Sequence, residues 1–445
     1  MRRRDFLNQC AVVAAGGALL QTGAWARVAG MSEGLPPLAR AASAAYLFGL
    51  PLLESARSRS ATLAAAGIAQ NEFHHDRQLA TADFRSVTTP NNDTLYSRVW
   101  LDLSKGPVTL SIPDMEDRYF CVPFLDIYSN HFAILGTRTT GGKGGVYTIV
   151  GPDMPGAGPD VIRSPTPQAW LIARLLVDGP DDLPAVHALQ DRFRVDGPSL
   201  PPPDEVPGYD ASSPELLDAI ARMMADNPPR PIDGEILAMM APLDMQAGPV
   251  AERFDAAGLA QIEQGRIAAE NAIKGPRRQG APVNRWIYPK YNIGNYGVDY
   301  LYRAQVALGG LGALPREEAM YMRAQGPEGT LDFAPGTDYV LSFARDELPP
   351  VDAFWSITMY ERTADGQWFL TSNPISRYAI GDRTEGLVYN EDGSLDIHFS
   401  SRDPGEGKNW LPAPADKIWN VVFRGYLPRD AMLLGDYALP EMKML

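Results

Sequence analysis

The feature that most constrains the fold is the presence of short β-strand patterns in two separate stretches of the chain, at about 91–150 and from about 339 onward. In the first stretch, "VTLSIP" places Val108, Leu110 and Ile112 on one face and hydroxyl side chains on the other, which is the period of a half-buried strand. In the second, "YVLSFA", "AFWSITMYE", "LDIHFS" and "IWNVVFRGYL" are separated by turn residues, a spacing typical of a sandwich or jelly roll. The sequence therefore predicts an α+β fold, mainly β, with two β-rich subdomains.

Helix-forming segments lie before and between these stretches. One is predicted at 38–67, with Pro51 as a kink or boundary. A short helix is predicted for "PTPQAWLIARLLV" at 165–177, and a proline-rich connector leads into two further helices, the first with Ser213 as its N-cap. At 445 residues the chain is long enough for more than one domain. The predicted domains are a signal peptide at 1–26, an N-terminal β-rich domain with leading helices at 27–197, the proline-rich connector and helical insert at 198–285, and a C-terminal jelly-roll-like domain at 286–445.

The first 26 residues have the form of an export signal. The pair Arg3-Arg4 is followed by a short apolar segment and by the A-x-A cleavage pattern Ala24-Trp25-Ala26. This is the twin-arginine form, which predicts a periplasmic or secreted protein that is handled by the twin-arginine export machinery. No other apolar run approaches the length that spans a bilayer, so no membrane span is predicted.

The charge of the chain limits its partners. Removal of the signal would take away three arginines and one aspartate and change the formal net charge from −14 to −16. Such an acidic protein binds nucleic acid and anionic membranes poorly, so no nucleic-acid partner is predicted. Neutral or cationic substrates fit this charge better, although a local basic pocket is an alternative that the net charge does not exclude.

Motifs for metals and cofactors are missing from the sequence. The five histidines form no H-x-x-x-H or H-E-x-x-H set, and neither a phosphate loop nor a G-x-S-x-G elbow is found. No cofactor is therefore predicted, while a carboxylate-bound divalent cation stays open. Cys121 is the single cysteine after the signal and is predicted to be a buried core thiol.

Polar and aromatic residues gather in several short segments that are typical of a pocket for a polar organic ligand. Turn chemistry explains many of the same residues, because Asn and Asp favour turns. An aspartate among amides and aromatic rings has a pKa that can move toward the working pH, so Asp93 is the first choice for general acid or base. The predicted catalytic residues are Asp93, Tyr96, Asp126 and Tyr128, with Asp126 as the second carboxylate of a pair and Tyr128 with it on one face of a strand. The predicted substrate-binding residues are Asn91, Asn92, Arg98, Asn373, Arg377, Arg383, Asn409 and Trp410.

Several of these segments resemble a known pair of domains. "TPNNDTLYSRVWLDL", "GPVTLSIPD" and "DRYFCVPFLDIYSN" are similar to domain of unknown function 1254. "FWSITMYE", "TSNPISRYAIGDR", "LVYNEDGSLDIHFS" and "NWLPAP" are similar to its usual C-terminal companion, domain of unknown function 1214. The resemblance implies two β-rich subdomains, the second similar to a jelly roll, with helices between and around them. It implies no reaction.

The leading functional hypothesis is an exported enzyme that acts on a small polar or glycan-like substrate. A hydrolase or lyase that uses carboxylate and tyrosine acid–base chemistry fits the predicted residues best. The alternative is a non-catalytic periplasmic ligand-binding or envelope-assembly protein that uses the same pocket. A cofactor-dependent oxidoreductase is a weaker third choice, and a homo-oligomer stays open.

Overall fold

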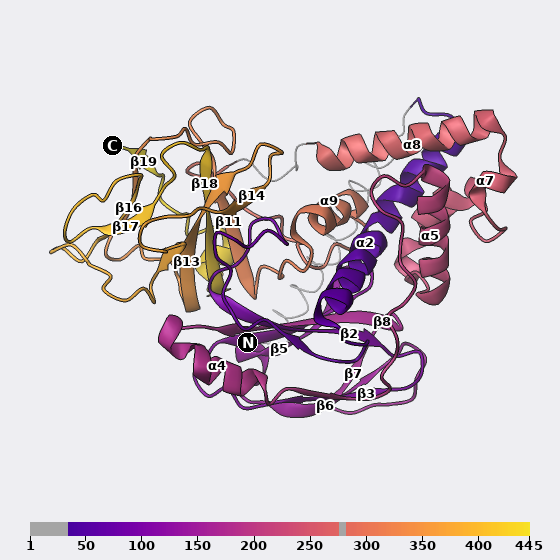
Figure 1. Cartoon of the computed structure of the whole chain (residues 1–445), viewed down its shortest axis with the longest axis horizontal. Coiled ribbons are helices and arrows are strands. Elements are labelled where there is room, and N and C mark those ends of the chain that lie inside the picture. Colours follow the sequence, from indigo (N-terminus) through magenta and orange to yellow (C-terminus); the bar gives the residue numbers. More distant parts are fainter. Residues whose placement is uncertain (1–33, 276–281) are drawn as a thin grey trace, which may run out of the picture.

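The computed structural model describes residues 34–275 and 282–445, so the predicted signal at 1–26 lies outside the described residues. Figure 1 shows three parts: an N-terminal β part, a bundle of helices beside it and a C-terminal β part. The α+β fold with two β-rich subdomains is confirmed. Among the described residues, no helix combines the length and the apolar character that a membrane crossing requires.

The N-terminal β part consists of two sheets that share one apolar core. The five-stranded sheet has the order β1 (His74–His75), β2 (Thr94–Asp102), β8 (Gln168–Leu176), β4 (Phe120–Asp126), β5 (His131–Gly136). The four-stranded sheet has the order β7 (Val161–Arg163), β6 (Gly145–Val150), β3 (Val108–Ile112), β9 (Arg194–Asp196). Two short helices, α3 (Thr137–Thr140) and α4 (Leu183–Gln190), complete this part. The alternation predicted in β3 is confirmed, because Val108, Leu110 and Ile112 are buried in the core between the sheets.

The predicted helix at 165–177 is wrong, because this segment forms β8 in the middle of the five-stranded sheet. One face of β8 belongs to the core between the two sheets, and the other places Trp170 and Ile172 against the helices. A strand that is apolar on both faces has no two-residue period. The sequence pattern of β8 therefore does not separate it from a buried helix.

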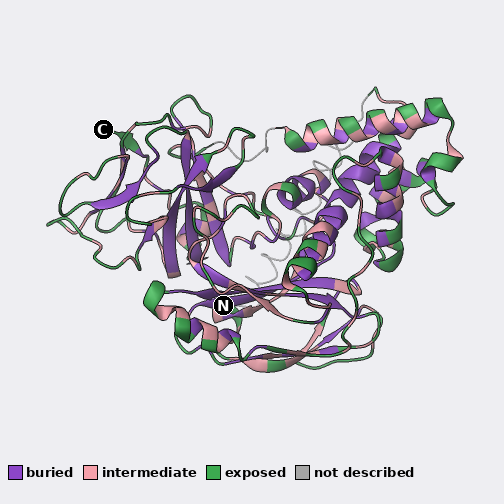
Figure 2. Cartoon of the chain, viewed as in Figure 1, coloured by how far each residue is buried: buried purple, intermediate pink, exposed green. Residues whose placement is uncertain are grey.

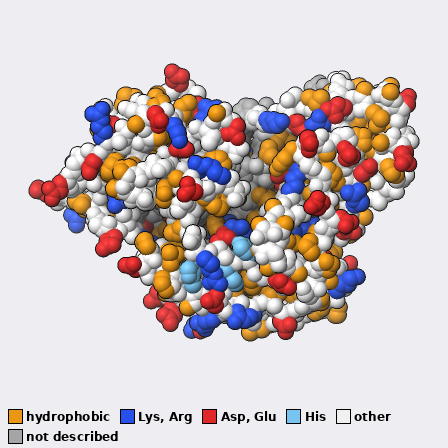
Figure 3. All heavy atoms as spheres, viewed as in Figure 1, with side chains coloured by type: hydrophobic (Ala, Val, Ile, Leu, Met, Phe, Trp, Pro, Cys, Tyr) orange, Lys and Arg blue, Asp and Glu red, His pale blue; other side chains and the backbone are white. Residues whose placement is uncertain are grey.

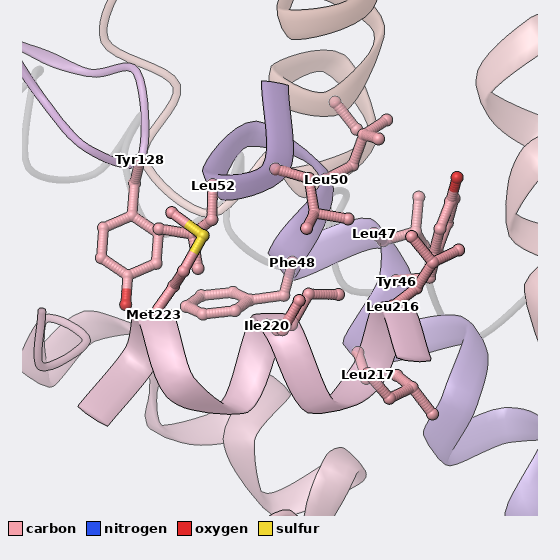
Figure 4. Packing of buried hydrophobic residues seen from close by; sticks show 14 of the residues in the cluster. Tyr46, Leu47, Phe48, Leu50, Leu52, Tyr128, Leu216, Leu217, Ile220 and Met223 are labelled. Atoms are coloured by element: carbon pink, nitrogen blue, oxygen red, sulfur yellow. The ribbon is translucent and has the colours of Figure 1, made fainter. Parts of the chain in front are cut away.

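The helices pack around one long central helix. They are α2 (Pro37–Ala66), α5 (Ser213–Asp226), α6 (Gly234–Met240), α7 (Val250–Arg253), α8 (Ala256–Lys274) and α9 (Tyr300–Gly310). Pro51 lies inside α2, and Figure 4 shows Phe48 of α2 beside Ile220 and Met223 of α5. The N-cap of α5 is Ser212 rather than the predicted Ser213, and its side chain accepts a hydrogen bond from the amide of Glu215 in a capping box.

The contact between α2 and α8 depends on a glycine. A Cβ atom at Gly265 would lie 2.1 Å from the carbonyl oxygen of Ala39 and 2.9 Å from Cβ of Ala42. The backbone of α8 therefore lies directly against that of α2, with no room for a side chain. This close approach fixes where α8 lies along the central helix.

The C-terminal β part is a sandwich of two sheets with a common core, as Figure 2 shows by its buried strands. One sheet has the order β10 (Trp286–Ile287), β11 (Ala319–Ala324), β18 (Trp419–Pro428), β13 (Val351–Arg362), β14 (Trp368–Leu370), with β15 (Ala379–Gly381) also paired to β13. The other has the order β17 (Asn409–Pro412), β16 (Leu395–Ser400), β12 (Tyr339–Phe343), β19 (Lys443–Met444), and α10 (Asp430–Leu434) follows β18. The sandwich form predicted from the sequence is confirmed.

The two β parts meet directly. Tyr119, Cys121 and Leu176 of the five-stranded sheet form one apolar cluster with Phe354 and Tyr426 of the six-stranded sheet. The rings of Phe354 and Tyr426 are stacked with centroids 4.1 Å apart. A polar site lies beside this small apolar interface.

We expect Gly265→Ala to lower the free energy of unfolding by about 1–3 kcal/mol, because the added methyl group forces α2 and α8 apart in a close-packed contact. Chemical denaturation monitored by circular dichroism measures this difference. Gly234→Ala in α6 is the matched control, since a Cβ atom there meets nothing within 4 Å, and its stability should equal or slightly exceed that of the wild type. Equal stability of the two variants would contradict the close contact.

Candidate active site between the two β parts

The segment 88–93, called the strap below, leads into β2 and crosses to the C-terminal sandwich. The amide of Thr89 donates to the carbonyl of Trp368 at 2.7 Å, and the hydroxyl of Tyr360 donates to the carbonyl of Pro90 at 2.7 Å. The guanidinium of Arg424 donates to the carbonyl of Thr89 at 3.2 Å. Backbone groups of the strap thus satisfy polar side chains of the other domain.

The strap lies against one row of side-by-side residues on the six-stranded sheet. Tyr321, Arg424, Ser356 and Gly381 are cross-strand neighbours on β11, β18, β13 and β15. The guanidinium of Arg424 also donates to the hydroxyl oxygens of Thr358 and Tyr360, each at 2.7 Å. The row therefore places a cation and hydroxyl groups directly beneath the strap.

Asp93, at the end of the strap, points its carboxylate at this row. Its Oδ2 accepts hydrogen bonds from the hydroxyls of Ser356 at 2.8 Å and Tyr426 at 3.4 Å, and Tyr426 in turn accepts one from the side-chain amide of Asn91 at 2.8 Å. Burial raises the pKa of Asp93, while the positive charge of Arg424 and the two hydroxyl donors lower it, and burial dominates. Asp93 still reaches solvent, since the residue is half-buried.

Asp382 provides a second carboxylate next to the row. Its Oδ1 accepts from the amide of Trp355 at 3.1 Å. Its pKa is raised to about 6, mainly by partial burial among protein atoms; the negative charge of Asp93 contributes to this rise, while the amide of Trp355 and the charge of Arg383 oppose it. The residue as a whole remains exposed to solvent. The preceding residue must be small, because a Cβ atom at Gly381 would lie 2.0 Å from the carbonyl oxygen of Trp355. The sequence places Asp382 in a polar and aromatic segment but does not single it out as a catalytic or binding residue, because a Gly-Asp pair alone indicates only a turn.

The five-stranded sheet contributes a matching polar row. Tyr96, Arg174 and Cys121 are cross-strand neighbours on β2, β8 and β4. The guanidinium of Arg174 lies 5.4 Å from the ring centroid of Tyr96, and this tyrosine is half-buried. Cys121 is fully buried, and burial raises the pKa of its thiol to about 12, as expected of a core thiol.

Other predicted residues of the "TPNNDTLYSR" segment stabilise the backbone around Asp93. Asn91 accepts the amide hydrogen of Asp93 at its Oδ1, at 2.5 Å, and Asn92 donates to the carbonyl of Ala80 at 2.6 Å. Arg98 forms an ion pair with Asp76 on the same side of the sheet. The side-chain oxygen of Asn91 is a turn-forming acceptor, so the turn interpretation is confirmed for Asn91, and the functional role of the segment stays a prediction.

Asp126 does not form a carboxylate pair with Asp93. In the sheet register Asp126 pairs with Ala169, whereas Thr94, the residue after Asp93, pairs with Leu176. Seven strand positions separate these two levels, a distance of about 23 Å at ~3.3 Å per residue. The carboxylate of Asp126 instead accepts from the amide of Asn130 at 2.9 Å and closes the turn after β4.

Tyr128 is also remote from Asp93. It lies in the turn between β4 and β5 rather than on a strand, so the predicted single strand face for Asp126 and Tyr128 is wrong. Its ring centroid lies 5.2 Å from that of Phe48, and its hydroxyl donates to the carbonyl of Asn227 at 2.7 Å. Figure 4 shows Tyr128 among the residues of the helical core. The left-handed conformation of Ser129 turns the chain at this point, which a polar pattern with a two-residue spacing does not predict.

The predicted C-terminal residues have mostly local contacts. The amide of Asn373 donates to the carbonyls of Thr371 and Arg377, and that of Asn409 donates to the carbonyls of Val388 and Asp396. Arg377 donates to the carbonyl of Trp410 at 2.9 Å, and the indole of Trp410 donates to the carbonyl of Ser400 at 2.9 Å.

Arg383 is different, because its guanidinium nitrogens Nε and Nη2 form an ion pair with Asp178 of the N-terminal β part. The strap passes close by, since the amide of Val177 donates to the carbonyl of Asp93 at 3.1 Å. The predicted residues that the structure brings to the domain boundary are therefore Asn91, Asp93, Tyr96 and Arg383.

A separate groove of about 560 Å³ lies near the far end of β2, between loops of the N-terminal part and the end of α5. Its lining includes Asp102, Asp153, Gln168 and Asp226 but none of the predicted site residues. Within 34–275 and 282–445, no three or more His, Cys, Asp or Glu side chains converge to form a metal-binding group. Figure 3 shows that one face of the molecule is hollowed where the three parts meet, with charged and histidine side chains at the lower edge of the hollow.

Comparisons with known proteins agree with the two-part architecture. The chain matches the family described as "Protein of unknown function (DUF1254)" at residues 70–197 and that described as "Protein of unknown function (DUF1214)" at residues 318–430. The chain thus carries a DUF1254 region followed by a DUF1214 region. The strap and β2 belong to the first domain, and the row on the six-stranded sheet belongs to the second.

A solved structure from Vibrio parahaemolyticus shares this fold. The VPA0106 protein from Vibrio parahaemolyticus is 23% identical and has a TM-score of 0.68, and the match covers 92% of this chain and 100% of that one. A putative uncharacterized protein from Burkholderia cenocepacia is 12% identical, with a TM-score of 0.46 and coverage of 96% and 98%. No curated protein matches the chain.

The raised pKa of Asp382 predicts a pH-dependent difference in stability. Relative to Asp382→Asn, the wild type should be most stable below pH 3.8, lose stability as the pH rises toward about 6, and change little above that, because ionisation is easier in the unfolded chain. Denaturant unfolding of both proteins at pH 4, 5, 6 and 7 measures this difference. A difference that stays constant over this range would show that the environment of Asp382 does not favour its neutral form.

Proposed function

We propose that the boundary between the two β parts is the active site of an acid–base enzyme, a hydrolase or lyase that acts on a small polar molecule. The observation that carries this proposal is the pair of solvent-reaching carboxylates, Asp93 and Asp382, which come from different domains and both have raised pKa values. Perturbed carboxylates in one site are a common property of enzymes that transfer protons.

The surroundings of the two carboxylates assign them different roles. Asp93 accepts hydrogen bonds from Ser356 and Tyr426 and lies near the charge of Arg424, and these three contacts favour its ionised form against the effect of burial. The negative charge of Asp93 in turn favours the protonated form of Asp382. Asp93 therefore serves as general base and Asp382 as general acid.

The two roles are sufficient for either reaction class. In a hydrolase, Asp93 removes a proton from the attacking water while Asp382 protonates the leaving group. In a lyase, Asp93 removes a proton from carbon and Asp382 again protonates the leaving group. The half-buried Tyr96 and Tyr321 lie at the same boundary and are suited to contact the substrate, whereas the fully buried Tyr426 positions Asp93.

Export through the twin-arginine route and a periplasmic setting remain part of this proposal, supported by the sequence of the first 26 residues. The second candidate function is a non-catalytic ligand-binding or envelope-assembly protein. It is favoured by the structural use of the same groups, since the hydrogen bonds of the strap to Trp368, Tyr360 and Arg424 also hold the domains together.

Replacement of Asp93 separates the two functions. Purified protein is incubated with periplasmic extract, and the metabolites are profiled before and after incubation. We expect one compound to be consumed, and Asp93→Asn to slow its consumption by 10²- to 10⁴-fold, the usual contribution of a general base. The asparagine oxygen still accepts from Ser356, so the fold should be kept, which thermal unfolding checks.

Asp153→Asn is the matched control, because Asp153 is exposed and lines the separate groove. It should consume the compound at the wild-type rate. Enrichment of a compound on the protein without consumption would support the binding protein instead, and full turnover by folded Asp93→Asn would refute the assignment of the base.

The pH dependence of turnover tests the acid. Because Asp382 must be protonated and has a pKa of about 6, kcat/KM should fall tenfold per pH unit above about pH 6. In Asp382→Asn the remaining activity should lack this decrease. The measurement is the rate of consumption of the identified compound from pH 4.5 to 8. An unchanged decrease in the variant would assign it to another group.

A further inference from the structure

Two arginines at the domain boundary are buried without an ion-pair partner. Arg174 is 5% exposed and Arg424 is 4% exposed, and neither forms an ion pair with any residue in the described part of the chain. Arg174 donates to two backbone carbonyls, those of Gly312 at 2.7 Å and Ile172 at 3.4 Å. A guanidinium stays protonated at all ordinary pH values, so both side chains carry a full positive charge.

The hydrogen-bond acceptors of Arg424 are neutral groups as well. Its nitrogens donate to the hydroxyl oxygens of Thr358 and Tyr360 and to a backbone carbonyl of the strap. Asp93 is the carboxylate that acts on Arg424, and the hydroxyls of Ser356 and Tyr426 already occupy one of its oxygens. A buried charge without a partner is costly, and proteins keep such charges where a ligand uses them.

Tyr321 lies near both arginines. It is the cross-strand neighbour of Arg424, and the charges of Arg174 and Arg424 both act on its hydroxyl, which burial keeps protonated by raising its pKa to about 12. Within residues 34–275 and 282–445 this hydroxyl has no hydrogen-bond partner, and the residue is half-buried. Tyr96, whose ring lies beside Arg174, is also half-buried. A hydrogen-bond donor that reaches solvent therefore lies near two buried cations.

We infer that this place binds the anionic group of the substrate, a carboxylate, with Tyr321 as hydrogen-bond donor and with Arg174 and Arg424 as the balancing charges. The inference rests on the proposed function, because it describes the substrate of the same site. A carboxylate accepts hydrogen bonds through two oxygens and fits a hydroxyl and guanidinium groups. The net charge of −14 belongs to the whole chain, and this site is a local exception to it.

The test uses sodium acetate as the probe and acetamide as its neutral analogue, at constant ionic strength, with the full chain. Binding is measured by saturation-transfer NMR titration. We expect saturable binding of acetate and none of acetamide at the same concentrations. Tyr321→Phe removes only the hydroxyl, and Arg174→Met removes the charge; each should weaken acetate binding at least tenfold.

Two matched controls lie on the surface of the N-terminal β part. Tyr147→Phe on β6 and Arg163→Met on β7 should bind acetate like the wild type. The inference is overturned if acetate does not bind saturably, or if neither Tyr321→Phe nor Arg174→Met changes its binding. It is also overturned if inorganic phosphate binds saturably and acetate does not.

Asp93→Asn distinguishes this inference from the proposed function. It should bind acetate as well as or better than the wild type, because it loses a nearby negative charge, although its turnover is lost. If Asp93→Asn slows turnover but the wild type does not bind acetate, the acid–base enzyme is still supported. The inference of an anionic substrate is then refuted.

Discussion

The hydrogen bond from the Ser356 hydroxyl to the Asp93 carboxylate, 2.8 Å long, joins two domains that are 263 residues apart at this contact. The strap around it supplies backbone acceptors to Arg424 and Tyr360, which are buried on the face of the six-stranded sheet. Without the strap, Arg424 would lose one of its three acceptors and the hydroxyl of Tyr360 would lose its acceptor, at a cost of about 1–3 kcal/mol for each group left buried and unsatisfied. The relative position of the two β parts therefore depends on a polar contact as much as on the small apolar cluster beside it.

The same contact explains how one site can have both a structural and a chemical role. Hydroxyl and guanidinium groups that hold Asp93 in place also set its charge state, and that charge acts on Asp382. Because Gly381 has no side chain, β15 can approach Trp355 closely, and this approach places Asp382 beside the row of Tyr321, Arg424, Ser356 and Gly381. The helices cover the other end of the five-stranded sheet, where Trp100 and Trp170 stack with centroids 4.8 Å apart. Among the predicted and observed site residues, Asp93 and Asp382 are the carboxylates that both have a raised pKa and reach solvent, and both lie at the boundary between the β parts.

Local patterns predicted the elements that have one clear period or cap. The strand β3 and the helix α2 follow their patterns, whereas β8 is apolar on both faces and does not reveal its conformation. Asp93 could be chosen from the sequence because amides and aromatic residues surround it within a few positions. Its partners could not, since Ser356, Asp382 and Arg424 are brought to it by strand pairing far along the chain. Asp126 was misplaced for the same reason: its distance from Asp93 depends on the register with β8.

The course of the strap has a consequence for work with separate domains. A fragment that begins after residue 197 would keep every strand of the C-terminal sandwich but would lack the strap. Its six-stranded sheet would then expose the apolar surface of Phe354 and Tyr426 to water, beside Arg424 and Tyr360. Such a fragment should be poorly soluble when expressed alone, and adding residues 88–93 as a peptide should improve its recovery. The family matches would divide the chain after residue 197, but the smallest soluble fragment that contains the C-terminal sandwich should also include the strap.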